Sequence, residues 1–430
     1  MPKPKIPEKF IHYVWEKGLL GRYFSLTSGE NCEIIHPGTS GNKDGPDFEN
    51  TQILIKNKFY AGNSEIHFQS SDWFLHEHNS DDAYEKIILH IVLVNNKTIY
   101  YKKGKTIPTI VLPKETIENL YIKYFSNLSS TNKKIKCSEI LKSIENNDFI
   151  RIANKLARVR FSKKTNLILE IFSKNNDWVE TTWKAVSVAF GLPHNKVPFE
   201  YLSNTISWKM LMRAGDVFSI EAILFGQGGF LENKKEFKNS YEQSLCEEFT
   251  HIKNKYSLLS LDVSVWKNSP IRPTSLPEMR IAQLSAVVKN IPDLFNKIIL
   301  AKNISDCYKI FKQPVSEFWT SHCKFETPYL SSGFIGKLAL DTIIINSVIP
   351  LKLAYAQYLN KKNKLKESIE IINLINAEKN EIINIFVQSG KFILKNAKQS
   401  QGIIELYNEY CKKEKCMNCP IMKNFINKKL

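Results

Sequence analysis

Cysteine is scarce in this sequence, with 8 residues among 430. A small secreted domain held by disulfides carries a far higher share, so we expect a reduced, cytoplasmic protein. Long apolar runs are also missing. The most membrane-like stretch, residues 338–353, contains Asp341 and Asn346 and is shorter than the ~20 apolar residues that a span needs. It predicts a buried helix and no membrane partner.

Arginine is scarce as well, although 60 Lys and Arg against 43 Asp and Glu give a net charge of +17 at pH 7. This excess suits a polyanionic partner such as DNA or RNA. A composition rich in lysine, asparagine and isoleucine throughout the chain would produce the same excess without such a partner. With 43% hydrophobic and 24% charged residues, the sequence is typical of a folded globular protein and excludes a disordered or collagen-like chain.

The hydrophobic pattern changes period along the chain. Helical spacing over residues 6–20 precedes a series of short strand-like and helical segments, namely strands at 32–36, 51–56 and 58–68, helical turns within 72–84, and strands at 87–94 and 106–112. Beyond residue 137 most of the chain has three-to-four spacing. We therefore predict an α+β protein with a mixed β-sheet module at 1–115, a linker at 116–136 and a large α-helical domain at 137–430.

The densest chemistry lies between residues 45 and 90. Asp47 opens one predicted strand, and Glu65 and His67 stand two residues apart on the next, so their side chains share a face of the sheet. Two converging carboxylates form an oxygen-rich site that suits Mg²⁺ or Mn²⁺. Such an ion can polarise a phosphodiester and activate water, and His67 could orient that water or accept its proton.

Asp47, preceded by proline and followed after seventeen residues by Glu65-Ile-His67, resembles the core of the PD-(D/E)XK nuclease superfamily. The predicted order of helix, three strands, helix and strand is similar too. The resemblance implies that Asp47 and Glu65 bind the metal and that the residue at position 67 assists the water. This sequence has His67 where the superfamily has lysine. Glu16 is the candidate for the glutamate that the superfamily carries on its first helix.

A second resemblance covers nearly the whole chain. Runs such as FIHYVWEKGLL, GNSEIHFQSSDWFLHEH, IRPTSLPEMRIAQL and YCKKEKCMNCPI identify the chain as a member of an uncharacterised bacterial family classified as a domain of unknown function. That family has no established activity, so membership implies no role for any residue.

Three functions therefore remain open. The leading hypothesis is a divalent-metal-dependent nuclease with Asp47, Glu65 and His67 at its centre. The first alternative is a nucleic-acid-binding protein that cannot cleave, because the lysine is missing. The second is a hydrolase whose Zn²⁺ is held by histidines drawn from His67, His76, His78 and His90, although His76 and His78 would not share one face of a helix.

Two further groups of residues attract attention. Cys411, Cys416 and Cys419 have a spacing found in some iron-sulfur proteins, and either Zn²⁺ or an iron-sulfur cluster would need a fourth ligand, for which Cys323 or His322 is available. The three thiols could equally be packed at the end of a helix. Two basic clusters could contact nucleic-acid phosphates or else clamp local carboxylates, and they comprise Arg158, Arg160, Lys163 and Lys164 in one and Arg272 and Arg280 in the other.

Overall fold

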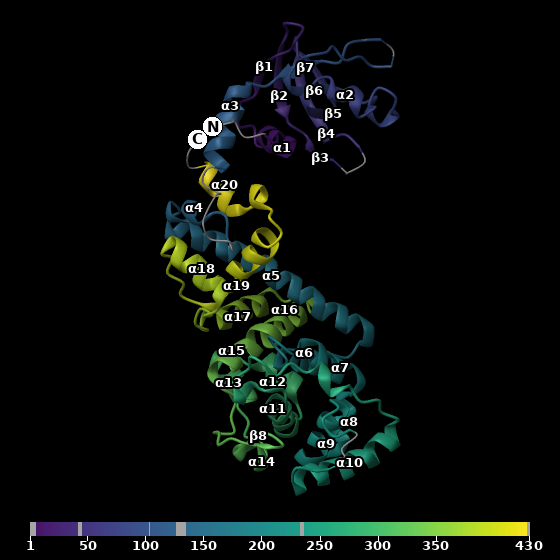
Figure 1. The fold of residues 1–430 in the computed structure, drawn as a ribbon, viewed down its shortest axis with the longest axis vertical. Coiled ribbons are helices and arrows are strands. Elements are labelled where there is room, and N and C mark those ends of the chain that lie inside the picture. Colours follow the sequence, from purple (N-terminus) through teal and green to yellow (C-terminus); the bar gives the residue numbers. More distant parts are fainter. Residues whose placement is uncertain (1–5, 42–44, 103, 126–134, 233–235, 428–430) are drawn as a thin grey trace. The chain divides into compact units, whose positions relative to one another are not determined.

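The computed structural model describes residues 6–41, 45–102, 104–125, 135–232 and 236–427 (Figure 1). The chain divides into two compact units. Unit 1 contains residues 1–144 together with 409–430, and unit 2 contains residues 145–408.

Unit 1 is built on a mixed seven-stranded sheet (Figure 1). The strand order is β1-β2-β4-β5-β6-β7, with β3 paired to β4 beside β2. Neighbours from β1 to β5 are antiparallel, whereas β5, β6 and β7 run parallel to one another. The strands are β1 (Tyr23–Ser25), β2 (Asn31–His36), β3 (Thr39–Ser40), β4 (Phe48–Ile55), β5 (Lys58–Gln69), β6 (Ile87–Val94) and β7 (Thr109–Val111).

Strands β4 and β5 form a hairpin that positions the residues of interest. Its two turn residues, Lys56 and Asn57, both have positive φ, which matches the right-handed twist of the flanking strands. Strand β6 has the sequence IILHIVLV and is almost entirely buried, as expected for a parallel strand covered on both faces. The parallel register places Glu65 of β5 opposite His90 of β6.

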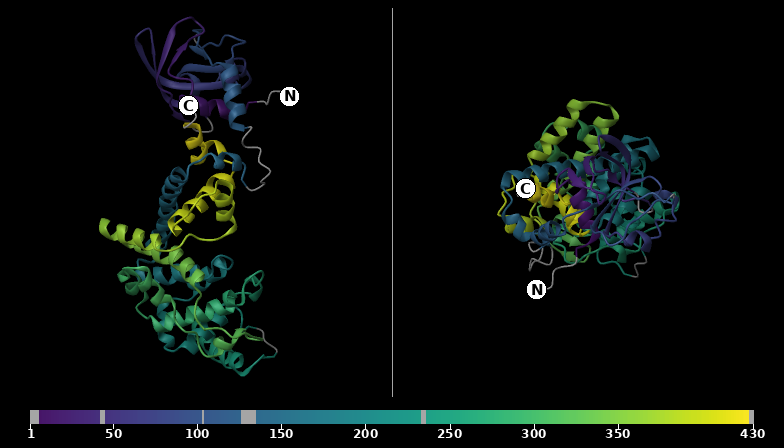
Figure 2. Two further views of the ribbon diagram at one scale, coloured as in Figure 1. Left: turned by 90° about the vertical axis from the view of Figure 1, so that its left-hand side faces the viewer. Right: turned by 90° about the horizontal axis from the view of Figure 1, so that it is seen from above.

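Helices pack against this sheet. Helix α1 (Glu8–Glu16) buries Phe10, Ile11 and Val14 and contacts β5. Figure 2 shows this purple helix beside the sheet. The short α2 (Asp72–Leu75) also contacts β5, and a 3₁₀ turn (Asp82–Tyr84) precedes β6. Unit 1 is completed by α3 (Lys114–Phe125), α4 (Ser138–Lys142) and α20 (Pro420–Asn427).

Unit 2 is largely helical. Asparagine, aspartate or serine begins many of its helices by accepting hydrogen bonds from the first exposed backbone N–H groups, as Asp177, Asp216 and Asn396 do. Its helices are α5 (Asn146–Asn175), α6 (Trp178–Phe190), α7 (Lys196–Thr205), α8 (Trp208–Ala214), α9 (Val217–Gln227), α10 (Ser240–Tyr256), α11 (Pro277–Asn290), α12 (Leu294–Leu300), α13 (Ile304–Phe311), α14 (Phe318–Ser321), α15 (Lys337–Ile343), α16 (Ile349–Tyr358), α17 (Lys362–Asn373), α18 (Glu381–Gly390) and α19 (Ala397–Leu406), with a small hairpin of β8 (His322–Lys324) and β9 (Thr327–Pro328).

The prediction of an α+β chain, with a mixed sheet followed by a largely helical region, is confirmed. The division into units differs from the predicted domain boundaries, because residues 409–430 group with the sheet. Much of the predicted linker at 116–136 belongs to α3, and residues 126–134 lie outside the described residues.

The apolar segment 338–353 forms part of a continuous helical stretch, Lys337–Tyr358. Of the 18 most apolar consecutive residues of this stretch, 72% are buried inside the protein. By length and composition alone this is the one helix among the described residues that could cross a membrane. Lys352 lies inside it, and its ammonium group donates to the carbonyls of Ile299 at 2.7 Å and Ala301 at 2.9 Å. These bonds satisfy carbonyls at the end of α12 and compensate the burial of the charge.

Glu221 of α9 is fully buried in unit 2. Its carboxylate accepts hydrogen bonds from the Tyr241 hydroxyl, from Ser316 Oγ at 2.9 Å and from Trp319 Nε1 at 3.1 Å. Burial nevertheless raises the pKa of Glu221 from its ordinary 4.5 to about 7.

We expect Glu221 to make unit 2 less stable as the pH rises. Because its pKa is higher in the folded than in the unfolded chain, its stabilising contribution is complete below pH 4.5 and is lost as the pH passes through about 7. The free energy of unfolding should fall by about 3 kcal/mol over this window relative to Glu221→Gln. Urea unfolding at several pH values measures this difference. Glu247→Gln, an exposed change on α10, is the control and should follow the wild type.

Candidate functional site

Asp47 and Glu65 meet where β4 and β5 begin to pair. The backbone N–H of Asp47 donates to Glu65 Oε2 at 2.9 Å, and the backbone N–H of Ile66 donates to Asp47 Oδ2 at 3.0 Å. These reciprocal bonds hold the two carboxylates beside each other. Burial and the negative charge of Glu65 raise the pKa of Asp47 to about 6.

Helix α1 adds two residues to this pair. Glu8 and His12 stand four residues apart on one face of the helix, and His12 Nε2 lies 3.7 Å from Glu8 Oε1 and 3.4 Å from Asp47 Oδ2. Burial acts to lower the pKa of His12, but the neighbouring carboxylates outweigh it and the net shift is upward. One ligand atom from each of Glu8, His12 and Asp47 lies within 4.8 Å of the other two.

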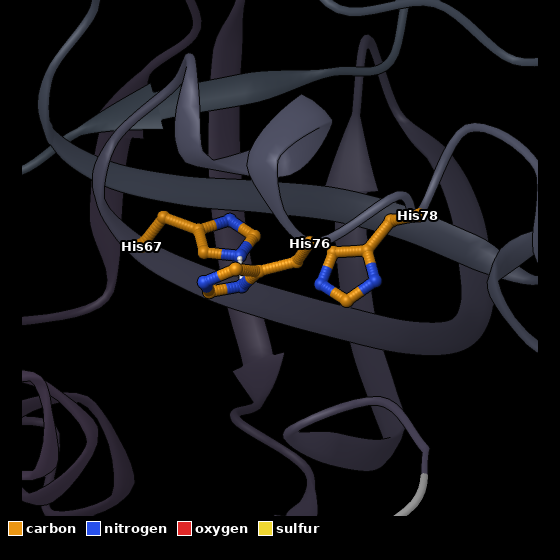
Figure 3. Close-up of side chains that lie close together, drawn as sticks. All are labelled: His67, His76 and His78. Carbon is orange, nitrogen blue, oxygen red and sulfur yellow. Dashed lines mark hydrogen bonds between the residues drawn. The ribbon is translucent and has the colours of Figure 1, made fainter.

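A second group consists of His67, His76 and His78, whose ligand atoms also lie within 4.8 Å of one another (Figure 3). His67 is on β5, whereas His76 and His78 follow the short helix α2. His67 Nε2 lies 3.1 Å from His76 Nδ1, the contact drawn as a dashed line in Figure 3. Glu65 Oε1 is 3.4 Å from His78 Nε2, so Glu65 adjoins this histidine group as well as Asp47.

His67 is neutral in this environment. Burial, followed by the influence of His90 and the other histidines, lowers the pKa of His67 to about 2. Its Nδ1 lies 2.9 Å from His90 Nε2. If Nδ1–H donates to His90, the lone pair of Nε2 faces His76 and Glu65, which is the arrangement of a metal-binding histidine oriented by an outer partner.

Several polar atoms of the site have no hydrogen-bond partner in the protein. They are buried nitrogens, namely His12 Nε2, His78 Nε2 and His90 Nδ1. Each buried nitrogen without a partner costs about 1–3 kcal/mol. His12 Nε2 and His78 Nε2 each lie 3.4 Å from a carboxylate oxygen, so a cation held between imidazole and carboxylate would satisfy both groups, and the donor set fits metal binding.

The two groups favour different ions. Imidazole nitrogens together with one carboxylate suit Zn²⁺ or Mn²⁺, whereas Glu8, Asp47 and a single imidazole suit Mg²⁺ or Mn²⁺. Divalent cations held here would supply Lewis-acid polarisation and a bound water of lowered pKa.

The structure brings together most of the residues that the sequence indicated for this site. Asp47, Glu65 and His67 are neighbours, and His76 and His78 reach His67 because an irregular turn carries them, where a helix would separate them. His90 contacts His67 from β6 and stands outside the group of three. Glu16, the expected helix glutamate, pairs with Lys17.

Sequence reasoning missed Glu8 and His12. Their signal was available, because residues at i and i+4 of an amphipathic helix share a face. What could not be read from the sequence was that this face meets Asp47.

The predicted basic cluster on α5 is largely engaged within unit 2. Arg160 and Lys163 pair with Glu405 of α19 at 3.4 Å and 2.6 Å. Lys164 donates to Asn346 at 2.7 Å, and burial lowers its pKa to about 7. Arg158 stays exposed. Arg272 and Arg280 line a pocket near the start of α11, and Cys411, Cys416 and Cys419 belong to unit 1.

The sequence profile of a family described as "Protein of unknown function (DUF2851)" matches residues 8–381. The chain belongs to this family. No curated protein and no solved structure shows significant similarity to it. The DUF2851 match includes both candidate cation groups and ends before the three C-terminal cysteines.

We expect His76→Ala to weaken metal binding without unfolding the protein, because His76 is the exposed member of its group. Mn²⁺ or Zn²⁺ at one hundred times its Kd should stabilise the wild type by about 2.7 kcal/mol in thermal unfolding, and most of this gain should be absent in the variant. His251→Ala, an exposed change on α10, should retain it. Equal stabilisation of all three proteins would exclude this metal site.

Proposed function

We propose that this protein is a divalent-metal-dependent nuclease that hydrolyses phosphodiester bonds of DNA or RNA. The observation that carries the proposal is that Asp47, Glu65 and His67 lie together, with Glu8 and His12 beside Asp47. Glu65 contacts both Asp47 of the oxygen-rich group and His78 of the nitrogen-rich group. Nucleases commonly use one or two such ions to stabilise the attacking and leaving oxygens.

The topology supports the PD-(D/E)XK resemblance. Along the chain α1 precedes the five strands β1 to β5, then α2 and the parallel strand β6. Without the short strands β1 and β3, this is the order that the resemblance implies. Asp47 stands directly before β4, and Glu65-Ile-His67 lies on β5. Glu8 provides a carboxylate on the first helix.

The roles of the side chains follow from their exposure. The His67 side chain is 1% exposed and neutral, which suits a ligand more than a base that must exchange protons with water. The His12 side chain is 26% exposed and its Nε2 lies 3.4 Å from Asp47 Oδ2, so we assign it to the same cation group as Glu8 and Asp47. Asp47 and Glu65 would hold cations and orient His12 and His78.

A pocket of about 210 Å³ adjoins His78 and suits part of a nucleic acid. Aromatic rings can stack on bases, and lysines can pair with phosphates. The pocket is lined by residues of both kinds, among them Tyr84, Tyr100 and Lys105. Asp81 and Glu85 also line it, and Lys102 in the lining pairs with Asp82.

A zinc hydrolase acting on another substrate is the second candidate, and the proximity of His67, His76 and His78 favours it. Metal analysis separates the two: Mg²⁺- or Mn²⁺-supported cleavage of nucleic acid supports the nuclease, whereas stoichiometric zinc without such cleavage supports the alternative. Nucleic-acid binding without cleavage by the metal-loaded protein would indicate a non-catalytic binding protein.

Loss of a residue that only orients a metal ligand costs roughly 10–100-fold in activity. We expect Asp47→Asn and Glu65→Gln to reduce the rate of Mn²⁺-supported cleavage by more than this. Both amides keep an oxygen that can accept the backbone N–H bond, so the fold should survive. Initial rates on single- and double-stranded DNA and on RNA measure the effect.

Glu30→Gln, which removes an exposed ion pair with Lys56, is the matched control and should cleave at the wild-type rate. Unchanged cleavage by Asp47→Asn would contradict the proposal.

A further inference from the structure

The four cysteines Cys137, Cys411, Cys416 and Cys419 gather in unit 1. Cys137 stands directly before α4, and the other three come from the C-terminal segment that packs on the same helix through α20. Cys137 therefore takes the place that the sequence offered to Cys323 or His322, both of which belong to unit 2. All four thiols are free.

Local backbone structure directs these sulfurs. A 3₁₀ turn over Cys416–Asn418, with the Cys419 N–H donating to the Cys416 carbonyl at 3.1 Å, brings the ends of the Cys-x₂-Cys segment together. The backbone N–H groups of Ile421 and Met422, at the start of α20, hydrogen-bond the Cys419 sulfur. An ion pair of 2.9 Å between Lys136 and Glu414 joins the two chain segments beside the cysteines.

Without a bound cation, the thiols at this site ionise less readily than an exposed cysteine. Burial and the neighbouring thiols raise the pKa of Cys137 to about 12, and burial raises that of Cys419 to about 11, although N–H bonds to its sulfur and nearby Lys423 act in the opposite direction. Backbone N–H bonds to sulfur favour the thiolate, which is the form that binds metal.

We propose that Cys137, Cys411, Cys416 and Cys419 are the four ligands of one thiophilic metal centre that joins the C-terminal segment to α4. Each thiol would release its proton to solvent as its sulfur binds. A single zinc ion with Zn–S bonds of about 2.3 Å places tetrahedral sulfurs roughly 3.8 Å apart. Zn²⁺ and an iron-sulfur cluster can both take four thiolate ligands, so either suits this set of residues.

Anaerobic purification with metal, sulfide and visible-absorption analysis tests the proposal. We expect near-stoichiometric occupancy in the wild type and at least a tenfold loss of bound metal in Cys137→Ser and Cys416→Ser. Cys246→Ser, a half-buried thiol of unit 2, is the matched control and should retain the metal. Iron with sulfide or stoichiometric zinc supports the site, and the element found identifies its occupant.

A wild-type protein without zinc or iron overturns the whole proposal, as does full metal content in Cys137→Ser. If the variants do not fold, alkylation of the native wild type decides. Four of the eight cysteines should become reactive only after chelation or oxidation of the centre, and unchanged reactivity contradicts the site.

A second and independent observation concerns Arg280 in unit 2. Its side chain is buried, with the residue 8% exposed, and it lines a pocket of about 260 Å³ together with Arg272, His194 and Ser275. The guanidinium donates to Gln283 Oε1 at 3.0 Å and to Ser275 Oγ at 3.1 Å, both neutral acceptors. Within the part of the chain that the structure describes, no carboxylate pairs with it.

A buried cation without a counterion is costly, and an anion in the pocket would compensate it. The first turn of α11 begins with Pro277, which has no N–H, and contains Glu278, so it is the charge of Arg280 that favours an anion here. We infer that this pocket binds a phosphate group, either free or as part of a phosphorylated ligand. The inference rests on the pocket alone and requires no cleavage activity.

Thermal unfolding with inorganic phosphate and with a short 5′-phosphorylated oligonucleotide tests the inference. Both probes should stabilise the wild type. Arg272→Ala, an exposed change, should weaken binding about tenfold, the loss of one charged contact, and Arg280→Met should abolish it. Arg213→Ala, on the exposed end of α8, is the control.

Stabilisation by free phosphate alone identifies a free anion as the ligand, and stabilisation by the oligonucleotide alone identifies a phosphorylated ligand. An absence of stabilisation by either probe at millimolar concentration overturns the inference, as does wild-type affinity in a folded Arg280→Met protein.

Discussion

The candidate site depends on the pairing of β4 with β5 next to Asp47. Here the Asp47 carboxylate accepts a hydrogen bond from the backbone N–H of Ile66, and the Glu65 carboxylate accepts one from the backbone N–H of Asp47. A shift of register by one residue would turn Glu65 and His67 to the opposite face of the sheet. The reciprocal bonds thus secure both the strand pairing and the position of Asp47 and Glu65 relative to the candidate ligands on α1, β5 and the turn after α2.

The site combines two chemical environments around Glu65. On one side, His12 is partly open to solvent between two carboxylates, and its pKa is raised. On the other side, His67 and His90 are buried, and their pKa values are lowered to about 2 and about 3. Neutral imidazoles in a buried cluster suit metal binding. The opposite pKa shifts follow from the depth of His67 and His90 in the fold and from the carboxylates beside His12.

Unit 2 shows how differently buried charges can be compensated. Lys352 donates to backbone carbonyls at the end of α12, and Glu221 accepts from three neutral donors. Arg280 has only neutral acceptors from side chains, and it lines a pocket. The charges of Lys352 and Glu221 are compensated by groups of the protein, whereas Arg280 could still bind an anion.

The sequence by itself determined the α+β order, the hairpin that carries Asp47 and Glu65, and the shared face of Glu65 and His67. These features follow from local periodicity and from the two-residue repeat of a strand. Only the tertiary structure decided that Glu8 replaces Glu16 beside Asp47, that Arg160 and Lys163 pair with Glu405, and that Cys137 joins cysteines more than 270 residues further along the chain. Those contacts depend on how helix faces and distant segments pack, which no local pattern encodes.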